Sequence, residues 1–453
     1  MARLFGTNGI RGLANKDMDG AFAMRLGQAF GTTLPEGSAV ALGTDTRTSN
    51  RMLASAVTAG LLSTGVSVRD AGIVTTPALQ YAVKRAAELV AGVVVTASHN
   101  PPEFNGVKFV DHDGTELATE KEDRVEAVFF ASSFRAAPWD RIHGVDPLPG
   151  VNTRYVDAVV TQVDAARIRD RHLTVVCDTS NGAGGLTAPV LLRRLGCRTI
   201  MLNAQLDGTF PGHASEPTPE NVKDLVASVP TFGADLGVVQ DGDADRCVFV
   251  DERGRYIPGD RTLALVAGQV VSATGGGTVV TPVSSSSCVE DYVTQKGGRV
   301  EYTKVGAPVV ARRMMEIGAV FGGEENGGLI FPQHQHCRDA SMTLAAVLEI
   351  LARTGRKLGD LIDEVPEYHV HKHKIACAEE AKARVLEAFA AAHTGDRVDR
   401  TDGVKVLSKD GWVLVRPSGT EPIVRVYAES RDATRARALG DAALDELRRL
   451  VPR

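Results

Sequence analysis

One repeated pattern restricts the fold of this chain more than any other feature of its sequence. A short run of apolar residues leads into a loop of small, polar or acidic residues, and an apolar helical stretch follows. The run from Val93 to Val95 and the run from Leu236 to Val239 are clear examples. Strands that alternate with helices in this way are typical of α/β domains, in which helices cover both faces of a sheet. Such sheets bind ligands at the carboxyl ends of their strands, so we expect the loops to face a shared cleft.

Breaks in this pattern divide the 453 residues into four predicted domains. We expect three tandem doubly wound mixed-sheet α/β domains and a C-terminal α+β domain around a central cleft. The last segment differs because a hairpin and a further strand lie between two predicted helices. The predicted domains comprise residues 1–150, 151–254, 255–366 and 367–453.

The charge balance excludes some classes of partner. The chain has 51 Lys and Arg against 56 Asp and Glu, a net charge of −5, which disfavours nucleic acid or a membrane surface as the main partner. No apolar run is long enough to span a bilayer, and the first residues lack the core of a signal peptide. The six cysteines are scattered without a CxxC pair, so we predict a reduced, cytoplasmic protein with buried thiols.

The stretch from Val93 to Lys108 presents a serine at the end of an apolar strand. Pro101 and Pro102 cannot continue the strand, so Ser98 should lie on a loop at its carboxyl end. A serine there is a candidate nucleophile if a base and a stabilising charge lie nearby, and His99, Asn100 and Lys108 are expected to crowd the same loop. The ordinary alternative is a turn serine that caps the next element.

Asp241, Asp243 and Asp245 form a DxDxD run between two apolar strands. Three carboxylates so close together repel one another and require a cation. An EF-hand is excluded because Arg246 occupies the position of its obligatory glycine. A solvated acidic turn is the alternative, but the flanking strands favour a metal site, and Mg²⁺ suits phosphate chemistry.

Two further loops have residues suited to binding anions. The segment FGTNGIRG carries Arg11 and is either an ordinary glycine turn or an anion-binding loop. The second loop follows a predicted strand and combines small hydroxyl residues and glycine with arginine, so it can hold a phosphate or form a Pro-Gly turn. Its candidate ligands are Arg416, Ser418, Gly419, Thr420 and Arg425.

Other polar residues have weaker assignments. Glu324 and Asn326, in the segment GEENGG, are expected on a flexible loop, where they suit sugar hydroxyls but also fit a plain acidic turn. Lys304 is a candidate proton-transfer group or a surface lysine. The alternating His369, His371 and His373 share one face of a predicted strand, which indicates a transition-metal site or, as the simpler reading, a solvated edge strand.

Together these motifs resemble the α-D-phosphohexomutase superfamily. The segment TASHNP around Ser98, the aspartate run, GEENGG and the segment RPSGTEP occur in the order typical of that superfamily, and the resemblance covers essentially the whole chain. FGTNGIRG and GEENGG look most like archaeal phosphoglucosamine mutases and their phosphomannomutase relatives. The resemblance implies four domains around a central cleft and a reaction that interconverts hexose 6-phosphate and hexose 1-phosphate.

The resemblance also implies roles for individual residues. Ser98 would be a phosphoserine that, with the three aspartates, holds Mg²⁺, and a hexose 1,6-bisphosphate would be the intermediate and activator. Glu324 and Asn326 would bind sugar hydroxyls, and the loop at Arg416 would hold the phosphate that is not reacting. The other implied catalytic residues are His99, Lys108, Arg11, Arg246 and Lys304.

Some residues depart from the pattern common in this superfamily. These differences affect the prediction of which sugar is bound and leave the predicted class of reaction unchanged. Many relatives carry Asp at the position of Asn8, Ser at Asn326 and His at Gly328, and Ala307 replaces a commonly acidic residue. We expect glucosamine 6-phosphate as substrate, with phosphomannomutase or phosphoglucomutase activity as the alternative. A catalytically silent phosphosugar-binding protein and a Mg²⁺-dependent phosphatase are the hypotheses from other classes. A monomer and a homodimer are both compatible with the sequence.

Overall fold

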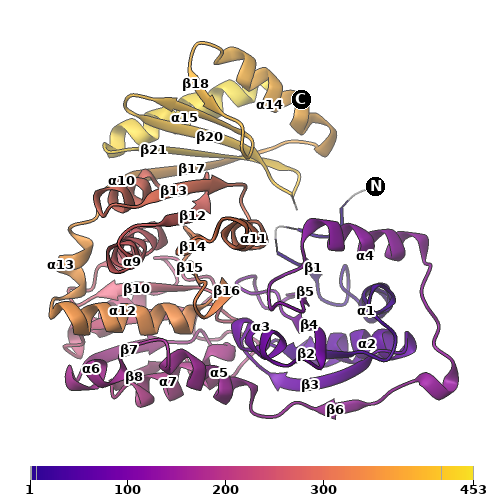
Figure 1. Ribbon diagram of the computed structural model, residues 1–453. Helices are drawn as coiled ribbons and strands as arrows, with labels where there is room; N and C mark the ends of the chain where they lie inside the picture. Colours follow the sequence, from indigo (N-terminus) through magenta and orange to yellow (C-terminus); the bar gives the residue numbers. More distant parts are fainter. Residues whose placement is uncertain (1–2, 7, 420, 452–453) are drawn as a thin grey trace. The chain divides into compact units, whose positions relative to one another are not determined.

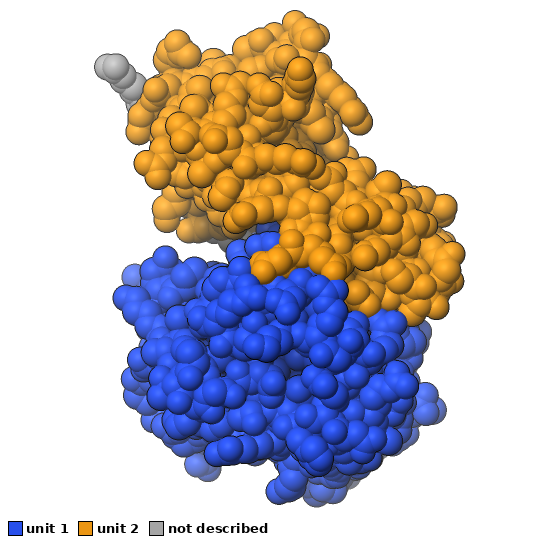
Figure 2. Space-filling model, turned by 90° about the vertical axis from the view of Figure 1, so that its left-hand side faces the viewer, with its two compact units in different colours: residues 1–262, 326–362 blue, residues 263–325, 363–453 orange. Residues whose placement is uncertain are grey.

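The computed structural model describes residues 3–6, 8–419 and 421–451, which fold into two compact units (Figure 2). Unit 1 comprises residues 1–262 and 326–362, and unit 2 comprises residues 263–325 and 363–453. The chain therefore leaves unit 1, returns to it once and leaves again.

The first sheet of unit 1 has six strands in the order β1-β5-β4-β2-β3-β6 (Figure 1). Four strands are parallel, whereas β5 is antiparallel to β4 and β1 is antiparallel to β5. β4 is fully buried at its carboxyl end because three successive valines fill it. The strands are β1 (Ile10–Leu13), β2 (Ala39–Thr44), β3 (Ser67–Ile73), β4 (Leu89–Val95), β5 (Phe104–Asp111) and β6 (Val145–Pro147).

Four helices accompany this sheet, and their ends follow local capping rules. The Asp19 side chain accepts a hydrogen bond from the Phe22 amide at the start of α1, and Thr75 caps α3 in the same way before Pro77. α1 packs against α2 and α4, whereas α3 packs on β2 and β4. The helices are α1 (Gly20–Thr33), α2 (Asn50–Ser63), α3 (Thr76–Arg85) and α4 (Thr119–Ala131).

The second sheet of unit 1 has five strands in the order β11-β10-β9-β7-β8. β7 is parallel to β8 and β9, and β10 is antiparallel to β9, so the aspartate run forms the turn of a hairpin. The strands are β7 (Thr174–Asp178), β8 (Arg198–Leu202), β9 (Leu236–Gln240), β10 (Cys247–Asp251) and β11 (Tyr256–Ile257). The helical segments before and within this part are η1 (Trp139–Arg141), α5 (Val151–Val160), α6 (Ala165–Asp170), η2 (Ala183–Leu186), α7 (Ala188–Arg194) and α8 (Lys223–Thr231).

The returning segment completes unit 1 with an antiparallel pair, β15 (Gly328–Phe331) and β16 (Gln335–Arg338), and two helices. α12 (Ala340–Thr354) is buried along almost its whole length, which its nearly continuous apolar sequence requires. It packs on α5, α6 and α7, and α13 (Leu358–Ile362) follows it.

Unit 2 contains an α/β part and an antiparallel part. In the α/β part, β12 (Thr278–Pro282) is parallel to β13 (Arg299–Thr303) and β14 (Phe321–Glu324). Its helices are α9 (Gly259–Thr274), whose first four residues belong to unit 1, α10 (Ser287–Gln295) and α11 (Ala307–Ile317).

The antiparallel part is a five-stranded sheet in the order β17-β21-β20-β19-β18, and α15 packs on β17, β21 and β20. The amphipathic sequence of α15 explains this, because its apolar side chains join the core of the sheet. The elements are β17 (His369–Ala376), α14 (Glu379–Ala392), β18 (Arg397–Asp399), β19 (Val404–Ser408), β20 (Gly411–Pro417), β21 (Ile423–Ser430) and α15 (Ala433–Leu450).

The predicted fold class is confirmed, with three mixed α/β sheets and one antiparallel sheet. Three local placements were wrong. Arg11 and Lys108 lie on β1 and β5, not in loops, because β1 and β5 pair with each other and β5 also pairs with β4. Glu324 is the last residue of β14, not part of a flexible loop. No helix in the described part of the chain is both long and apolar enough to cross a membrane.

Candidate active site

Ser98 lies in the turn between β4 and β5 and is fully buried. Its φ of 54° falls in the left-handed region, which costs a residue other than glycine about 1–2 kcal/mol. Its amide donates to Thr96 Oγ1 at 2.9 Å, and its hydroxyl donates to Asp241 Oδ2 at 2.7 Å. Gly242 permits this approach, because a Cβ there would lie only 2.7 Å from the Ser98 carbonyl oxygen. The serine hydroxyl is thus fixed against the aspartate run.

The guanidinium of Arg47 fixes the backbone of the same loop. Arg47 is buried, and its Nε pairs with Asp45 Oδ2 at 3.1 Å, which also accepts a hydrogen bond from Thr96 Oγ1 at 2.6 Å. Its two terminal nitrogens donate to four loop carbonyls, those of Ser98 (2.9 Å), Asn100 (2.5 Å), Pro101 (2.6 Å) and Phe104 (2.8 Å). A planar, five-donor group is needed for this arrangement, and a lysine could not reproduce it.

The carboxylates of Asp241, Asp243 and Asp245 are all buried in the turn between β9 and β10. Each offers one oxygen, and these oxygens lie within 4.8 Å of one another. Burial, followed by the charges of Asp245 and Asp243, raises the pKa of Asp241 to about 8. Burial also acts to raise the pKa of Asp245, but nearby cations, Arg338 first, outweigh it and hold that pKa well below its usual range.

The hydrogen bonds of this cluster fall on one side of the carboxylates. Asp243 Oδ2 accepts from Lys108 Nζ at 2.6 Å and from Thr76 Oγ1 at 2.5 Å. Asp245 Oδ2 accepts from Lys108 Nζ at 3.0 Å and from Arg338 Nη2 at 2.5 Å. The two Oδ1 atoms are buried and accept no hydrogen bond from the residues that the structure describes. Buried anionic oxygens without donors are the ligands that Mg²⁺ prefers, so the donor set fits this ion.

Further cations surround the serine. Arg11 Nη1 donates to Asn100 Oδ1 at 2.8 Å, and burial, followed by the charge of Arg246, lowers the pKa of Arg11 to about 10. Burial and the same arginines, Arg246 first, lower the pKa of His99 well below 6.5, so its ring is neutral at physiological pH. Its Nδ1 lies 3.1 Å from Arg246 Nη1 and 3.5 Å from Ser98 Oγ. Asp241 Oδ2, at 2.7 Å, is therefore the nearer hydrogen-bond partner of the serine hydroxyl, and His99 Nδ1 lies at 3.5 Å.

The predicted phosphate loop follows β20 in unit 2. Arg416 pairs directly with Arg425 across β20 and β21, an arrangement of like charges that needs compensation. Arg416 Nε lies 3.0 Å from Asp402 Oδ2, and Arg425 Nη2 lies 2.8 Å from Glu421 Oε2. Thr420 lies outside the described residues.

A buried lysine supports this loop from α14. Lys382 Nζ donates to the carbonyls of Ser418 at 2.6 Å and Glu421 at 2.8 Å. Gly419 is exposed, and a Cβ there would meet no atom within 4 Å. Hydrogen bonds from Lys382 thus fix the backbone of the loop on its buried side, while the loop is exposed to solvent at Gly419.

The remaining predicted residues are distributed over both units. Lys304, directly after β13 in unit 2, is exposed. Glu324 is buried in unit 2, and its Oε1 accepts a hydrogen bond from the Gly306 amide at 3.2 Å. Asn326 belongs to unit 1, where its Oδ1 accepts from the Gly328 amide at 3.1 Å.

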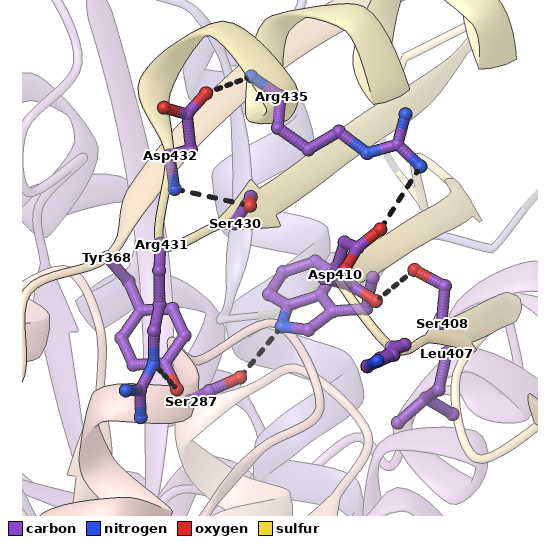
Figure 3. Close-up of a pocket in the computed structure, with 12 residues that line it drawn as sticks. Ser287, Tyr368, Leu407, Ser408, Asp410, Ser430, Arg431, Asp432 and Arg435 are labelled. Carbon is purple, nitrogen blue, oxygen red and sulfur yellow. Dashed lines mark hydrogen bonds and ion pairs between the residues drawn. The ribbon is translucent and has the colours of Figure 1, made fainter.

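A pocket of about 570 Å³ in unit 2 lies at the start of β20, at the opposite end of that strand from the Arg416 loop (Figure 3). Trp412 forms part of its wall and donates from Nε1 to Ser287 Oγ at 3.1 Å. Its Arg431 is paired with Asp291 at 2.7 Å. The residues that line this pocket include no residue of the predicted active site.

Comparison with known proteins agrees with this geometry. Models of the phosphoglucomutase/phosphomannomutase family match four successive parts of the chain: alpha/beta/alpha domains I, II and III over residues 2–136, 153–254 and 258–368, and the C-terminal domain over residues 373–446. A phosphoglucomutase/phosphomannomutase of Thermococcus kodakarensis is 46% identical over 98% of this chain and 99% of its own.

Two further relatives cover the whole length. A phosphoglucosamine/phosphogalactosamine mutase of Sulfurisphaera tokodaii is 39% identical over 100% of this chain and 99% of its own. The crystal structure of a phosphoglucomutase/phosphomannomutase family protein from Burkholderia thailandensis superposes with a TM-score of 0.87, at 29% identity, over 99% of this chain and 98% of that one. The class is that of isomerases that move a phosphoryl group between two positions of a hexose. The chain belongs to the phosphoglucomutase/phosphomannomutase family and is a phosphohexomutase.

Sequence reasoning missed four residues that the structure places around these groups: Arg47, Thr76, Arg338 and Lys382. A signal existed for Arg47, because Asp45 and Arg47 follow an apolar strand just as the aspartate run does. No local signal pointed to the other three, because each acts through a residue more than 30 positions away.

We expect Arg47→Lys to lower kcat about 10- to 100-fold with little change in KM, because a displacement of the serine loop affects the reacting atoms more than substrate binding. Arg135→Lys is the matched control. Arg135 also donates to three backbone carbonyls, those of Gly31, Leu34 and Thr64, but these do not belong to the serine loop. The control should lower the thermal midpoint and leave kcat unchanged. Equal losses of kcat in both variants would mean that Arg47 acts only through stability.

Proposed function

We propose that Ser98 carries the phosphoryl group of this phosphohexomutase and that, together with Asp241, Asp243 and Asp245, it holds Mg²⁺. The observation that supports this most directly is the buried Ser98 hydroxyl, 2.7 Å from Asp241 and among converging cations. The enzyme would interconvert hexose 6-phosphate and hexose 1-phosphate through a hexose 1,6-bisphosphate.

The charge balance of the site supports this assignment. Three carboxylates face four cations, which are Lys108, Arg338, Arg246 and Arg11. With all three carboxylates ionised, as metal binding requires, Mg²⁺ would raise this surplus from one to three positive charges, and a phosphoserine contributes about −1.5 to −2. The phosphorylated form with bound metal therefore carries a net charge of about +1 to +1.5, whereas the unmodified serine with bound metal would leave about +3. When bound, Mg²⁺ supplies charge neutralisation at the phosphoryl oxygens.

In the proposed transfer, a sugar hydroxyl attacks the phosphorus of phosphoserine 98. The bond between phosphorus and Ser98 Oγ breaks, the bond to the sugar oxygen forms, and the hydroxyl proton passes to a base. Arg11 and Arg246 would bind the moving phosphoryl oxygens. Asp243 and Asp245 outweigh the effect of burial and raise the pKa of Lys108, so it is an ammonium that stabilises negative charge on the leaving serine oxygen, and it is the proposed donor of the proton to that oxygen. Lys304 is the second proposed proton-transfer group.

We further propose that the Arg416 loop binds the phosphate that is not reacting. Arg416 and Arg425 lie opposite each other on paired strands, and each guanidinium has one carboxylate beside it. A phosphate between two guanidinium groups would relieve their repulsion through charge-assisted hydrogen bonds. The open outer side of the loop at Gly419, supported by Lys382, leaves room for Ser418 and Gly419 to contribute.

The proposed substrate is glucosamine 6-phosphate, with mannose or glucose phosphates as the alternative. Glucosamine differs from these sugars by an amine at C2, which is largely protonated at neutral pH. Glu324 ends β14 and is buried, and a second carboxylate, that of Glu325, follows it directly. A buried carboxylate binds an ammonium group through a charge-assisted hydrogen bond more strongly than it binds a hydroxyl. The 39% identity with a phosphoglucosamine/phosphogalactosamine mutase supports this choice, whereas the 46% identity with a phosphoglucomutase/phosphomannomutase supports the alternative.

The test compares glucosamine, mannose and glucose 6-phosphates, each with its 1,6-bisphosphate as activator. We expect the wild-type kcat/KM to be at least about tenfold higher for glucosamine 6-phosphate. Glu324→Gln should lower this value about 10- to 100-fold while changing the values for the neutral sugars only a few-fold. Glu301→Gln, which alters a half-exposed carboxylate paired with Arg313, is the control and should change none of them. Higher kcat/KM for mannose or glucose phosphate would establish the alternative.

A further inference from the structure

The C-terminal sheet carries a cluster of two histidines and one carboxylate that the proposed reaction does not use. His371 and His373 are two residues apart on the edge strand β17, so their side chains project from the same face. Asp441 lies on α15, which packs on β17. Each residue offers one ligand atom, and the three atoms lie within 4.8 Å of one another.

The distances within this cluster match those of a metal site. His373 Nε2 lies 2.9 Å and His371 Nε2 lies 3.8 Å from the same atom, Asp441 Oδ1. In tetrahedral zinc with bonds of about 2.0–2.1 Å, ligand atoms stand about 3.3 Å apart, between these two values. The two rings are nearly perpendicular, with centroids 4.4 Å apart, so both nitrogens approach one point without steric overlap.

The residue before the carboxylate permits this close approach of helix and strand. Residue 440 is a glycine, and a Cβ there would lie 3.0 Å from His371 Cδ2 and 3.5 Å from His373 Cδ2. The three ligand side chains are partly exposed, at 31%, 22% and 55% for His371, His373 and Asp441. An ion can therefore enter from solvent, and water can complete its coordination.

We propose that His371, His373 and Asp441 bind a divalent transition-metal ion, with Zn²⁺ as the best match. Imidazole and carboxylate ligands suit zinc, whereas Mg²⁺ prefers oxygen ligands alone, so the two metal sites of this chain differ in chemistry. The bound ion joins the edge strand β17 to α15. A ligand that binds only the folded state stabilises that state by mass action. The bound ion therefore raises the thermal stability of the C-terminal sheet.

The test uses the untagged full-length protein, because a histidine tag would itself bind zinc. Zn²⁺ is titrated calorimetrically in the presence of excess Mg²⁺, which saturates the aspartate cluster. We expect about one Zn²⁺ per chain and a rise of the thermal midpoint with Zn²⁺ concentration. His371→Asn, His373→Asn and Asp441→Asn should each weaken binding at least about tenfold, and circular dichroism verifies that they remain folded.

His393→Asn is the matched control. His393 also contacts two carboxylates, but Asp396 Oδ2 lies 2.9 Å from Nδ1 and Glu446 Oε2 lies 3.3 Å from Nε2. These atoms lie on opposite sides of the ring and cannot share one ion with it. The control should bind Zn²⁺ as the wild type does. Absent binding in the wild type, or equal affinity in the three ligand variants, would overturn the proposal.

Discussion

Replacement of Ser98 by alanine is expected to reduce mutase turnover by about 10³-fold or more, because removal of a nucleophile abolishes the covalent route and leaves only substrate binding. The same variant should lose the phosphate found by mass spectrometry on the peptide that contains residue 98. Turnover is measured with hexose 6-phosphate and catalytic amounts of the 1,6-bisphosphate.

Ser180→Ala is the control for this experiment. Ser180 is also fully buried, follows a strand and has a positive φ of 50°, but its hydroxyl donates to the Gln240 carbonyl. It should keep both turnover and the phosphate at Ser98. Turnover in Ser98→Ala within a few-fold of the wild type would exclude Ser98 as the phosphoryl carrier.

Removal of the metal is expected to have a comparable effect. Chelation should stop turnover, and added Mg²⁺ should restore it, because the phosphoryl charge is otherwise uncompensated. Asp243→Asn removes one negative ligand and should raise the Mg²⁺ concentration for half-maximal activity by about 10- to 100-fold. Circular dichroism verifies that the variant is folded.

Asp178→Asn is the control for this experiment. It shows whether the effect of Asp243→Asn comes from the loss of a metal ligand or from the loss of a buried carboxylate in general. Asp178 is a fully buried aspartate at the end of β7 that contacts Asn203 and His213, outside the metal cluster. Its replacement should leave the Mg²⁺ dependence unchanged. Activity that survives exhaustive chelation in the wild type would contradict the metal assignment.

Local sequence patterns predicted the elements of this fold because most of them are set by local chemistry. The valine run of β4 and the cap-and-proline start of α3 both depend on neighbours in the chain. The placement of Lys108 failed for the opposite reason. Lys108 was assigned to a loop because prolines precede it. In the structure it lies on β5, and this strand is stabilised by pairing with β4 on one side and β1 on the other. The sequence of one strand alone does not determine which strand it will pair with.

The same distinction applies to the candidate site. Ser98 and the three aspartates were recognisable because each follows or joins apolar strands. Arg338 was not, because it reaches Asp245 from 93 positions away, and its sequence neighbours give no sign of that contact. The directions of the pKa shifts of Asp241 and Asp245 could not be predicted either. The two side chains are chemically identical, and their pKa values shift in opposite directions because different cations lie beside them.

The discontinuity of unit 1 has a consequence for the order of folding during synthesis. Domains fold from the N-terminus as the chain emerges, yet unit 1 needs residues 326–362 in addition to residues 1–262. Until then the nascent chain lacks α12 and the guanidinium of Arg338, so the three carboxylates of the aspartate run have one cation fewer than in the complete unit. A ribosome-bound chain that ends near residue 262 is therefore incomplete in its core and electrostatically uncompensated in its metal loop. Incomplete chains of this kind expose apolar surface that the finished unit buries, and such surface is what makes folding intermediates prone to aggregate.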